Sequence, residues 1–154
     1  MSLEARIIEL KLELPPPPKP GGIYAPVLIH GDLAYVSGHG PLRPDKTLHV
    51  GKVGDTISEE DGYAAARAVG LTMLATLKRE LGSLDRIVRI IKTLGMVNAA
   101  PDFANHPAVI NGFSSLWVEL LGDVNGKGTR SAVGMGSLPS NIAVEVEAIF
   151  QIKP

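Results

Sequence analysis

One arginine and two glutamates near the carboxyl terminus are the residues best suited to chemistry. Arg130 begins an apolar run that reaches Met135, and Glu145 and Glu147 lie on the next run, Ala143 to Ile152. In that second run apolar side chains alternate with polar ones, the pattern of a strand with one buried face. If the two strands are neighbours, a fixed cation and a carboxylate share one rim of a sheet. The alternative, which the pattern alone favours, is a surface arginine with two solvated glutamates.

Composition argues against several other kinds of chemistry. The 154-residue chain has no cysteine, which excludes disulfides, thiolate nucleophiles and zinc–thiolate sites. Its histidines (His30, His39, His49 and His106) show no paired spacing, so we expect no metal and no cofactor. Fifteen Lys and Arg balance sixteen Asp and Glu, so we expect no nucleic-acid partner. There is no basic leader and no apolar run of about 20 residues, so a cytoplasmic protein without membrane contact is expected.

The first half of the chain predicts short elements around a bend. One domain, residues 1–154, is expected from the length. Residues 3–14 predict a short helix passing into an edge strand, and PPPPKP (15–20) predicts an extended strap, a connector in preference to a ligand for a proline-binding domain. Segments 23–29 and 33–37 predict a hairpin. The glycines on either side of His39 then allow either a tight turn or the close approach of a small molecule.

The second half predicts two helices that alternate with strands. A short strand is possible at 48–53, before Ser58 and three acids that predict the start of a helix spanning Glu59–Leu81. Arg86–Asn98 predicts a strand, and Asp102–Gly122 predicts a second helix region with Pro107 in its first turn. This order predicts an α+β fold with a mixed sheet, both main helices on one face and hairpins at both ends. The other face, with Glu145, Glu147 and Gln151, is expected to be half-open.

Two stretches carry a resemblance to a known family. TRSAVG, LP and VEVEA within Thr129–Ala148, together with YVSG at Tyr35–Gly38, resemble the Rid/YjgF family of reactive enamine and imine deaminases, also called L-PSP endoribonucleases. The resemblance covers about Tyr24 to Ile152. It implies a chorismate-mutase-like fold, a homotrimer and clefts between subunits. The N-terminal helix and the strap look like additions to the family pattern.

The resemblance also implies roles for particular residues. An arginine at the position of Arg130 grips the substrate carboxylate, and a glutamate at the position of Glu145 positions or activates water, which leaves Glu147 structural or solvent-facing. Phe103 is more typical of a core than of a pocket, though it could serve both. Three positions depart from the family, which commonly has glutamine at His39, asparagine near Pro107 and cysteine at Ala132. The implied substrate-binding residues are Tyr24, Ser37, Gly38, His39, Phe103 and Ala132.

These roles fit one reaction and leave two alternatives. A guanidinium matches the carboxylate of a 2-imino acid with two hydrogen bonds, and Glu145 could accept a proton from the attacking water. The expected function is hydrolytic deamination of reactive 2-imino or enamino acids to 2-keto acids and ammonia. The first alternative is a non-catalytic protein that binds small carboxylates. A ribonuclease or translation inhibitor is the least favoured, because the charge is balanced.

Overall fold

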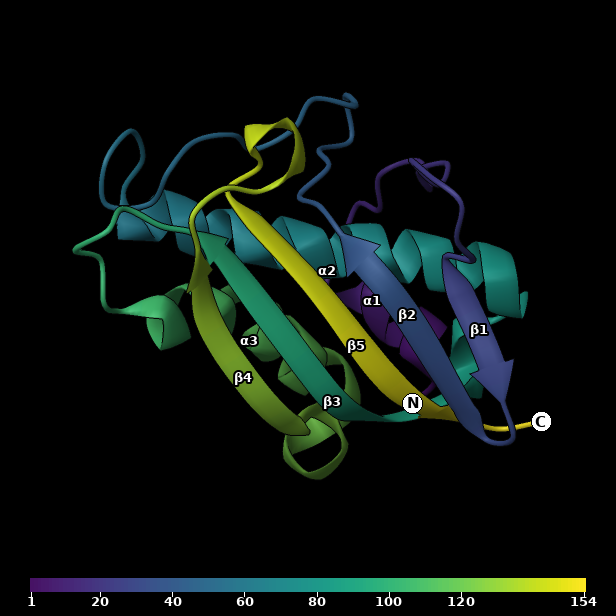
Figure 1. Ribbon diagram of the computed structural model, residues 1–154. Helices are drawn as coiled ribbons and strands as arrows, with labels where there is room; N and C mark the ends of the chain where they lie inside the picture. The colour runs from purple at the N-terminus through teal and green to yellow at the C-terminus, as the bar shows by residue number, and fades with distance from the viewer.

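The computed structural model describes residues 1–154 and contains one five-stranded sheet (Figure 1). The strands are β1 (Val27–His30), β2 (Leu33–His39), β3 (Ile87–Asn98), β4 (Thr129–Met135) and β5 (Val144–Ile152). Their order across the sheet is β1-β2-β5-β3-β4. Only the β3–β4 pair is parallel, and the other three pairs are antiparallel. The predicted mixed sheet is confirmed.

All three α-helices lie on one side of this sheet. Figure 1 shows α1 (Leu3–Glu9), α2 (Glu59–Leu81) and α3 (His106–Gly126) behind the strands. Two 3₁₀ helices, Leu84–Arg86 and Pro139–Asn141, complete the regular structure. None of the helices is both long and apolar enough to cross a bilayer. Because α2 and α3 lie on the same side of the sheet, the predicted α+β arrangement with both main helices on one face is confirmed.

Helix α2 begins and ends where its local signals predict. The Ser58 side chain accepts from the Asp61 N–H, and the Asp61 carboxylate accepts from the Ser58 N–H, so two free donors are satisfied together. Gly82 ends the helix with a φ of 78°. Gly112 of α3 lets the two helices touch, because a Cβ there would lie 2.0 Å from the carbonyl oxygen of Tyr63.

The core lies between the sheet and these helices. The apolar residues of β5 that alternate along the strand are at most 3% exposed, as the alternation predicts; they are Val144, Val146, Ala148, Phe150 and Ile152. Trp117 of α3 packs on Phe150 with 4.6 Å between ring centroids. Glu145, Glu147 and Gln151 lie on the opposite face, which no element of the chain covers. That face is referred to below as the open face.

The predicted hairpin at the carboxyl terminus is wrong. Strand β4 pairs only with β3, and β5 lies on the other side of β3. The physical reason is the crossover through α3, which joins two parallel strands and leaves β4 at the edge of the sheet. Residues 136–143 then pass over the end of β3 to reach β5.

Four other predicted boundaries also differ. Residues 10–14 form no strand; Leu10, Leu12 and Leu14 pack on the core from an extended chain, which explains their alternation. Residues 48–53 contribute only isolated bridges, and β1 is limited to Val27–His30. Helix α3 starts at His106, and it continues past Gly122, whose φ of 79° marks a kink.

Candidate functional site

Glu145 lies on the open face with its carboxylate above Gly38 of β2. A Cβ on Gly38 would come within 2.1 Å of Glu145 Oε1, so the missing side chain makes room for the carboxylate. No hydrogen bond or ion pair within the chain engages this carboxylate. Burial raises the pKa of the Glu145 carboxyl above its ordinary value of 4.5, and the negative charge of Glu147 raises it further. Glu145 is therefore a half-buried acid without a partner.

Ser37 and Tyr24 are neighbours of Gly38: Ser37 precedes it on β2, and Tyr24 shares a small cavity with it. The Ser37 hydroxyl donates to the Ala25 carbonyl at 2.7 Å, and the Ser37 N–H donates to the Pro26 carbonyl at 3.0 Å. These bonds hold the loop that carries Tyr24 against β2. Tyr24 lines a cavity of about 140 Å³ together with Gly38 and the end of the proline strap. Only Gly38 directly adjoins the Glu145 carboxylate, because Ser37 lines the cavity that contains Glu147 and the Tyr24 hydroxyl accepts from the Gly21 N–H at 3.1 Å. We call Glu145, Gly38 and these two neighbours of Gly38 the acid group.

His39 points away from the acid group because β2 has a bulge. Ser37 and Gly38, between Val36 and His39, oppose the single residue Glu147 of β5, so the His39 ring turns toward α2 and is 6% exposed. Its Nδ1 lies 2.6 Å from the Ser37 carbonyl oxygen and its Nε2 lies 2.9 Å from Thr76 Oγ1. Burial lowers the pKa of His39, which favours the neutral ring. Sequence reasoning missed this role in holding β2 on α2, and substrate contact by His39 stays a prediction.

Arg130 lies on the helix side of edge strand β4. Its Nη1 donates to Asn111 Oδ1 at 2.7 Å and to Ser114 Oγ at 3.1 Å, and its Nη2 donates to the Pro107 carbonyl at 3.5 Å. All of these acceptors are neutral and belong to α3, so they orient the guanidinium without cancelling its charge. The guanidinium lines a cavity of about 690 Å³ between α3 and the sheet edge. Sequence reasoning did not identify Asn111 and Ser114, although their i, i+3 spacing on a predicted helix places them on one face.

Within one chain Arg130 and Glu145 do not lie together at one edge of the sheet. The prediction that their strands, β4 and β5, are adjacent is wrong, because β3 lies between them. Arg130 is opposite Thr93 of β3, whereas Glu145 is opposite Met96 on the other side of β3. From the rise along a strand and the spacing between strands, their Cα atoms are about 14 Å apart. Arg130 also points to α3 whereas Glu145 points to the open face.

Phe103 and Ala132 lie on the Arg130 side of the sheet. Ala132 is two residues after Arg130 on the same face of β4 and packs against the core. Phe103 precedes α3, contacts the core and meets His106 edge-to-face at 5.3 Å. Phe103 also lines a cavity of about 470 Å³ with Lys52, so it serves both core and pocket. Neither residue joins the acid group in this chain.

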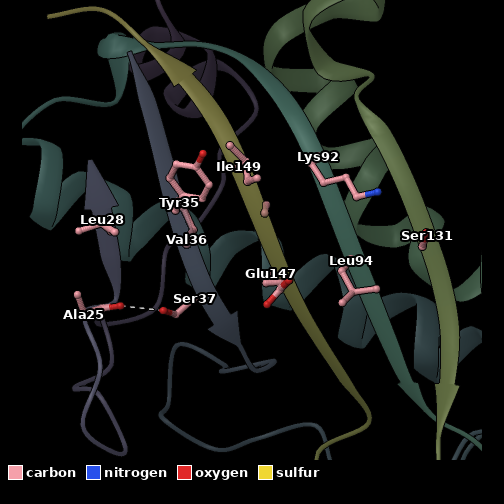
Figure 2. A pocket seen from close by; sticks show the side chains of 11 residues that line it. Ala25, Leu28, Tyr35, Val36, Ser37, Lys92, Leu94, Ser131, Glu147 and Ile149 are labelled. Atoms are coloured by element: carbon pink, nitrogen blue, oxygen red, sulfur yellow. Dashed lines mark hydrogen bonds between the residues drawn. The ribbon is translucent and has the colours of Figure 1, made fainter. Parts of the chain in front are cut away.

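The open face is apolar around Glu147. Figure 2 shows Tyr35, Leu94 and Ile149 standing on β2, β3 and β5, with Glu147 among them and the Ser37–Ala25 bond at one side. The cavity they line has a volume of about 480 Å³. Leu28 is 61% exposed and Tyr35 is 40% exposed. Glu147 therefore belongs to this apolar surface, whereas Glu145 belongs to the acid group. No cluster of three or more His, Asp or Glu side chains is arranged to hold a metal ion.

Known proteins resemble this chain over nearly its whole length. Residues 4–149 match the family model described as "YjgF/chorismate_mutase-like, putative endoribonuclease". Protein TCP17 of Trypanosoma cruzi is 33% identical over 148 residues, which cover 96% of this chain and 92% of that protein. The crystal structure of protein Atu1372 from Agrobacterium tumefaciens, of unknown function, has a TM-score of 0.88 and 38% identity, and the match covers 99% of this chain and 94% of that chain.

A second solved structure supports the same assignment. A "putative endoribonuclease" from Shewanella oneidensis has a TM-score of 0.92 and 30% identity, and the match covers 99% of this chain and 100% of that chain. The family model matches from residue 4, and both structural matches cover 99% of the chain, so the matched region includes the N-terminal residues. By sequence and by fold, the chain belongs to the YjgF/chorismate-mutase-like family.

Proposed function

We propose that the protein hydrolyses 2-imino and enamino acids to 2-keto acids and ammonia in a cleft between two copies of the chain. The observation that carries this proposal is the unpartnered Glu145 carboxylate, half-buried above Gly38. A half-buried acid with a raised pKa is a functional-site candidate, because folding alone gives no reason to leave it without a donor. Arg130 adds a cation whose hydrogen-bond partners are all neutral.

The two charged groups divide the reaction between them. Arg130 binds the substrate carboxylate and fixes the adjacent imine carbon. Glu145 accepts a proton from water as the water oxygen bonds to that carbon, and the C=N π electrons move to nitrogen. Glu145 passes that proton to the nitrogen, which completes a carbinolamine. Glu145 then moves the hydroxyl proton to the nitrogen as the C–N bond breaks, so ammonia leaves and the C–O bond becomes the carbonyl of the keto acid. A raised pKa makes Glu145 a stronger base than an ordinary carboxylate.

Assembly of several copies would bring the two groups together, and we propose a homotrimer. Arg130 lies on edge strand β4, whereas the acid group lies toward the opposite edge, beside β1 and β2. A head-to-tail ring can therefore place Arg130 of one copy near the acid group of the next. The apolar open face, with Leu28, Tyr35, Leu94 and Ile149, gives such a ring a surface to bury.

Binding of small carboxylates without catalysis is the second candidate. It is favoured by the way three neutral acceptors of α3 hold the Arg130 guanidinium in place. This function needs Arg130 and does not need Glu145, so the two candidates make different predictions for the same pair of substitutions.

The test is release of ammonia from a freshly generated 2-imino acid, compared with the rate in buffer. Arg130→Ala should abolish acceleration and binding together. Glu145→Gln should keep binding and lose turnover, because an amide cannot accept the proton. Glu147→Gln is the matched control on the same strand and should retain most of the turnover, with only a small loss because the Glu147 charge, the lesser cause, no longer raises the pKa of Glu145. Binding through Arg130 without acceleration by the wild type would replace the enzyme with the binding protein, and full activity in Arg130→Ala would refute both.

A further inference from the structure

The cavity beside Arg130 is unusually polar for a ligand site. It lies between α3, the β3–β4 edge and residues 126–128, with a volume of about 690 Å³. Only two of its twelve lining residues, Ile90 and Val118, are large apolar ones. Small-molecule pockets are usually lined mainly by hydrophobic side chains. A ligand that enters this cavity therefore meets hydrogen-bonding groups.

Among the charged side chains that line the cavity, Arg130 alone has no ionic partner within the chain. Glu119 lines the cavity, but Arg67 binds both of its carboxylate oxygens, at 3.0 and 2.8 Å. Asp123 also lines it and forms an ion pair with Lys127. Arg130 has only neutral acceptors. A carboxylate in this cavity is therefore drawn to Arg130.

Two hydroxyl groups line the same cavity and have no partner in the chain. Thr93 is opposite Arg130 in the β3–β4 register and is 3% exposed, yet its hydroxyl makes no hydrogen bond within the chain. Ser115 of α3 lines the cavity from the other side and also lacks such a bond. By contrast, the buried Thr72 hydroxyl donates to the Ala68 carbonyl at 2.9 Å. The Thr93 oxygen is not among the fully buried unpaired atoms, which are Arg89 Nε and Trp117 Nε1, so it opens to the cavity and is free to bond a ligand there.

We infer that this cavity receives the substrate side chain and selects imino acids whose side chain bears a hydroxyl or a similar hydrogen-bonding group. The inference rests on the proposed function, since Arg130 fixes the carboxylate and so directs the rest of the molecule over Thr93 and Ser115. Water and imine react as described above, and the side chain takes no part in the bond changes. Thr93 is a specificity-determining residue, not a catalytic one.

Two imines with the same number of non-hydrogen atoms test this selection. 2-Iminobutanoate and 3-hydroxy-2-iminopropanoate are generated from 2-aminobutyrate and serine by an amino acid oxidase with catalase present, and each rate is divided by its rate in buffer. Wild type should accelerate the hydroxylated imine more. Thr93→Val keeps the shape of the side chain and removes its hydroxyl. The acceleration of the hydroxylated imine should fall about fivefold, the factor that corresponds to one neutral hydrogen bond, and the acceleration of 2-iminobutanoate should not change. Thr47→Val is the control for the threonine-to-valine substitution itself, because Thr47 lies on an exposed turn and does not line the cavity.

The outcomes separate this inference from the proposed function. Equal acceleration of the two imines by wild type, or equal loss on both in Thr93→Val, overturns the selection while leaving deamination intact. If wild type accelerates neither imine, deamination fails, and calorimetry with 3-hydroxypyruvate and 2-oxobutanoate decides the selection. Tighter binding of 3-hydroxypyruvate that Thr93→Val abolishes supports it, and equal binding refutes it. Ser115→Ala serves as the second variant if Thr93→Val lowers the melting temperature.

Discussion

Replacing Gly38 with alanine tests whether the position of the Glu145 carboxylate matters. The new Cβ would lie 2.1 Å from Glu145 Oε1, whereas an ordinary carbon–oxygen contact is about 3.3 Å, so the carboxylate must move by about 1 Å or more. Gly38 does not have a positive φ, so the backbone accepts alanine. The displaced atoms end a flexible side chain, and an off-rotamer side chain costs only about 1 kcal/mol. The melting temperature should fall by about 2–4 °C.

Turnover should fall far more than stability does. A misplacement of about 1 Å in a catalytic group costs on the order of 100-fold in rate. The assay is ammonia release from an imino acid under saturating conditions, with carboxylate binding and oligomer mass measured on the same sample. Gly136→Ala is the control, because a Cβ there meets nothing within 4 Å. Wild-type turnover in Gly38→Ala, with Glu145 shown to have moved, would refute a role for this carboxylate in activating water.

Three further predictions concern stability and assembly. Gly112→Ala should lower the free energy of unfolding by about 3 kcal/mol, because its Cβ would lie 2.0 Å from a backbone oxygen of α2; an unchanged urea midpoint would contradict this. Burial lowers the pKa of His39 in the folded state, so protonation of this ring opposes folding. The contribution of neutral His39 to the free energy of unfolding is therefore complete above the ordinary pKa of 6.5 and is lost as the pH falls through the folded-state pKa. His39→Gln should remove that acid sensitivity from urea titrations between pH 7.5 and 5. Leu94→Glu should yield a monomer mass by light scattering, whereas we expect the mass of a trimer for the wild type.

The sequence by itself determined the elements whose signals are local. The bounds of α2 follow from Ser58, its three acids and Gly82, because capping and backbone freedom act within a few residues. The alternation of β5 correctly separated its buried face from Glu145 and Glu147, since successive side chains of a strand point to opposite faces. The strand at Arg86–Asn98 was predicted to within one residue of β3.

Only the tertiary structure decided how the candidate residues are grouped. Which strands pair, in what register and facing which way depends on contacts between distant segments, and no local pattern records them. Strand β4 could have been the neighbour of β5, yet the α3 crossover places it beyond β3 and turns Arg130 toward the helices. The bulge in β2 likewise decided that Gly38 makes room for Glu145 while His39 is buried against α2. One extra residue in a strand changes the face of every side chain that follows, so these assignments required the folded sheet.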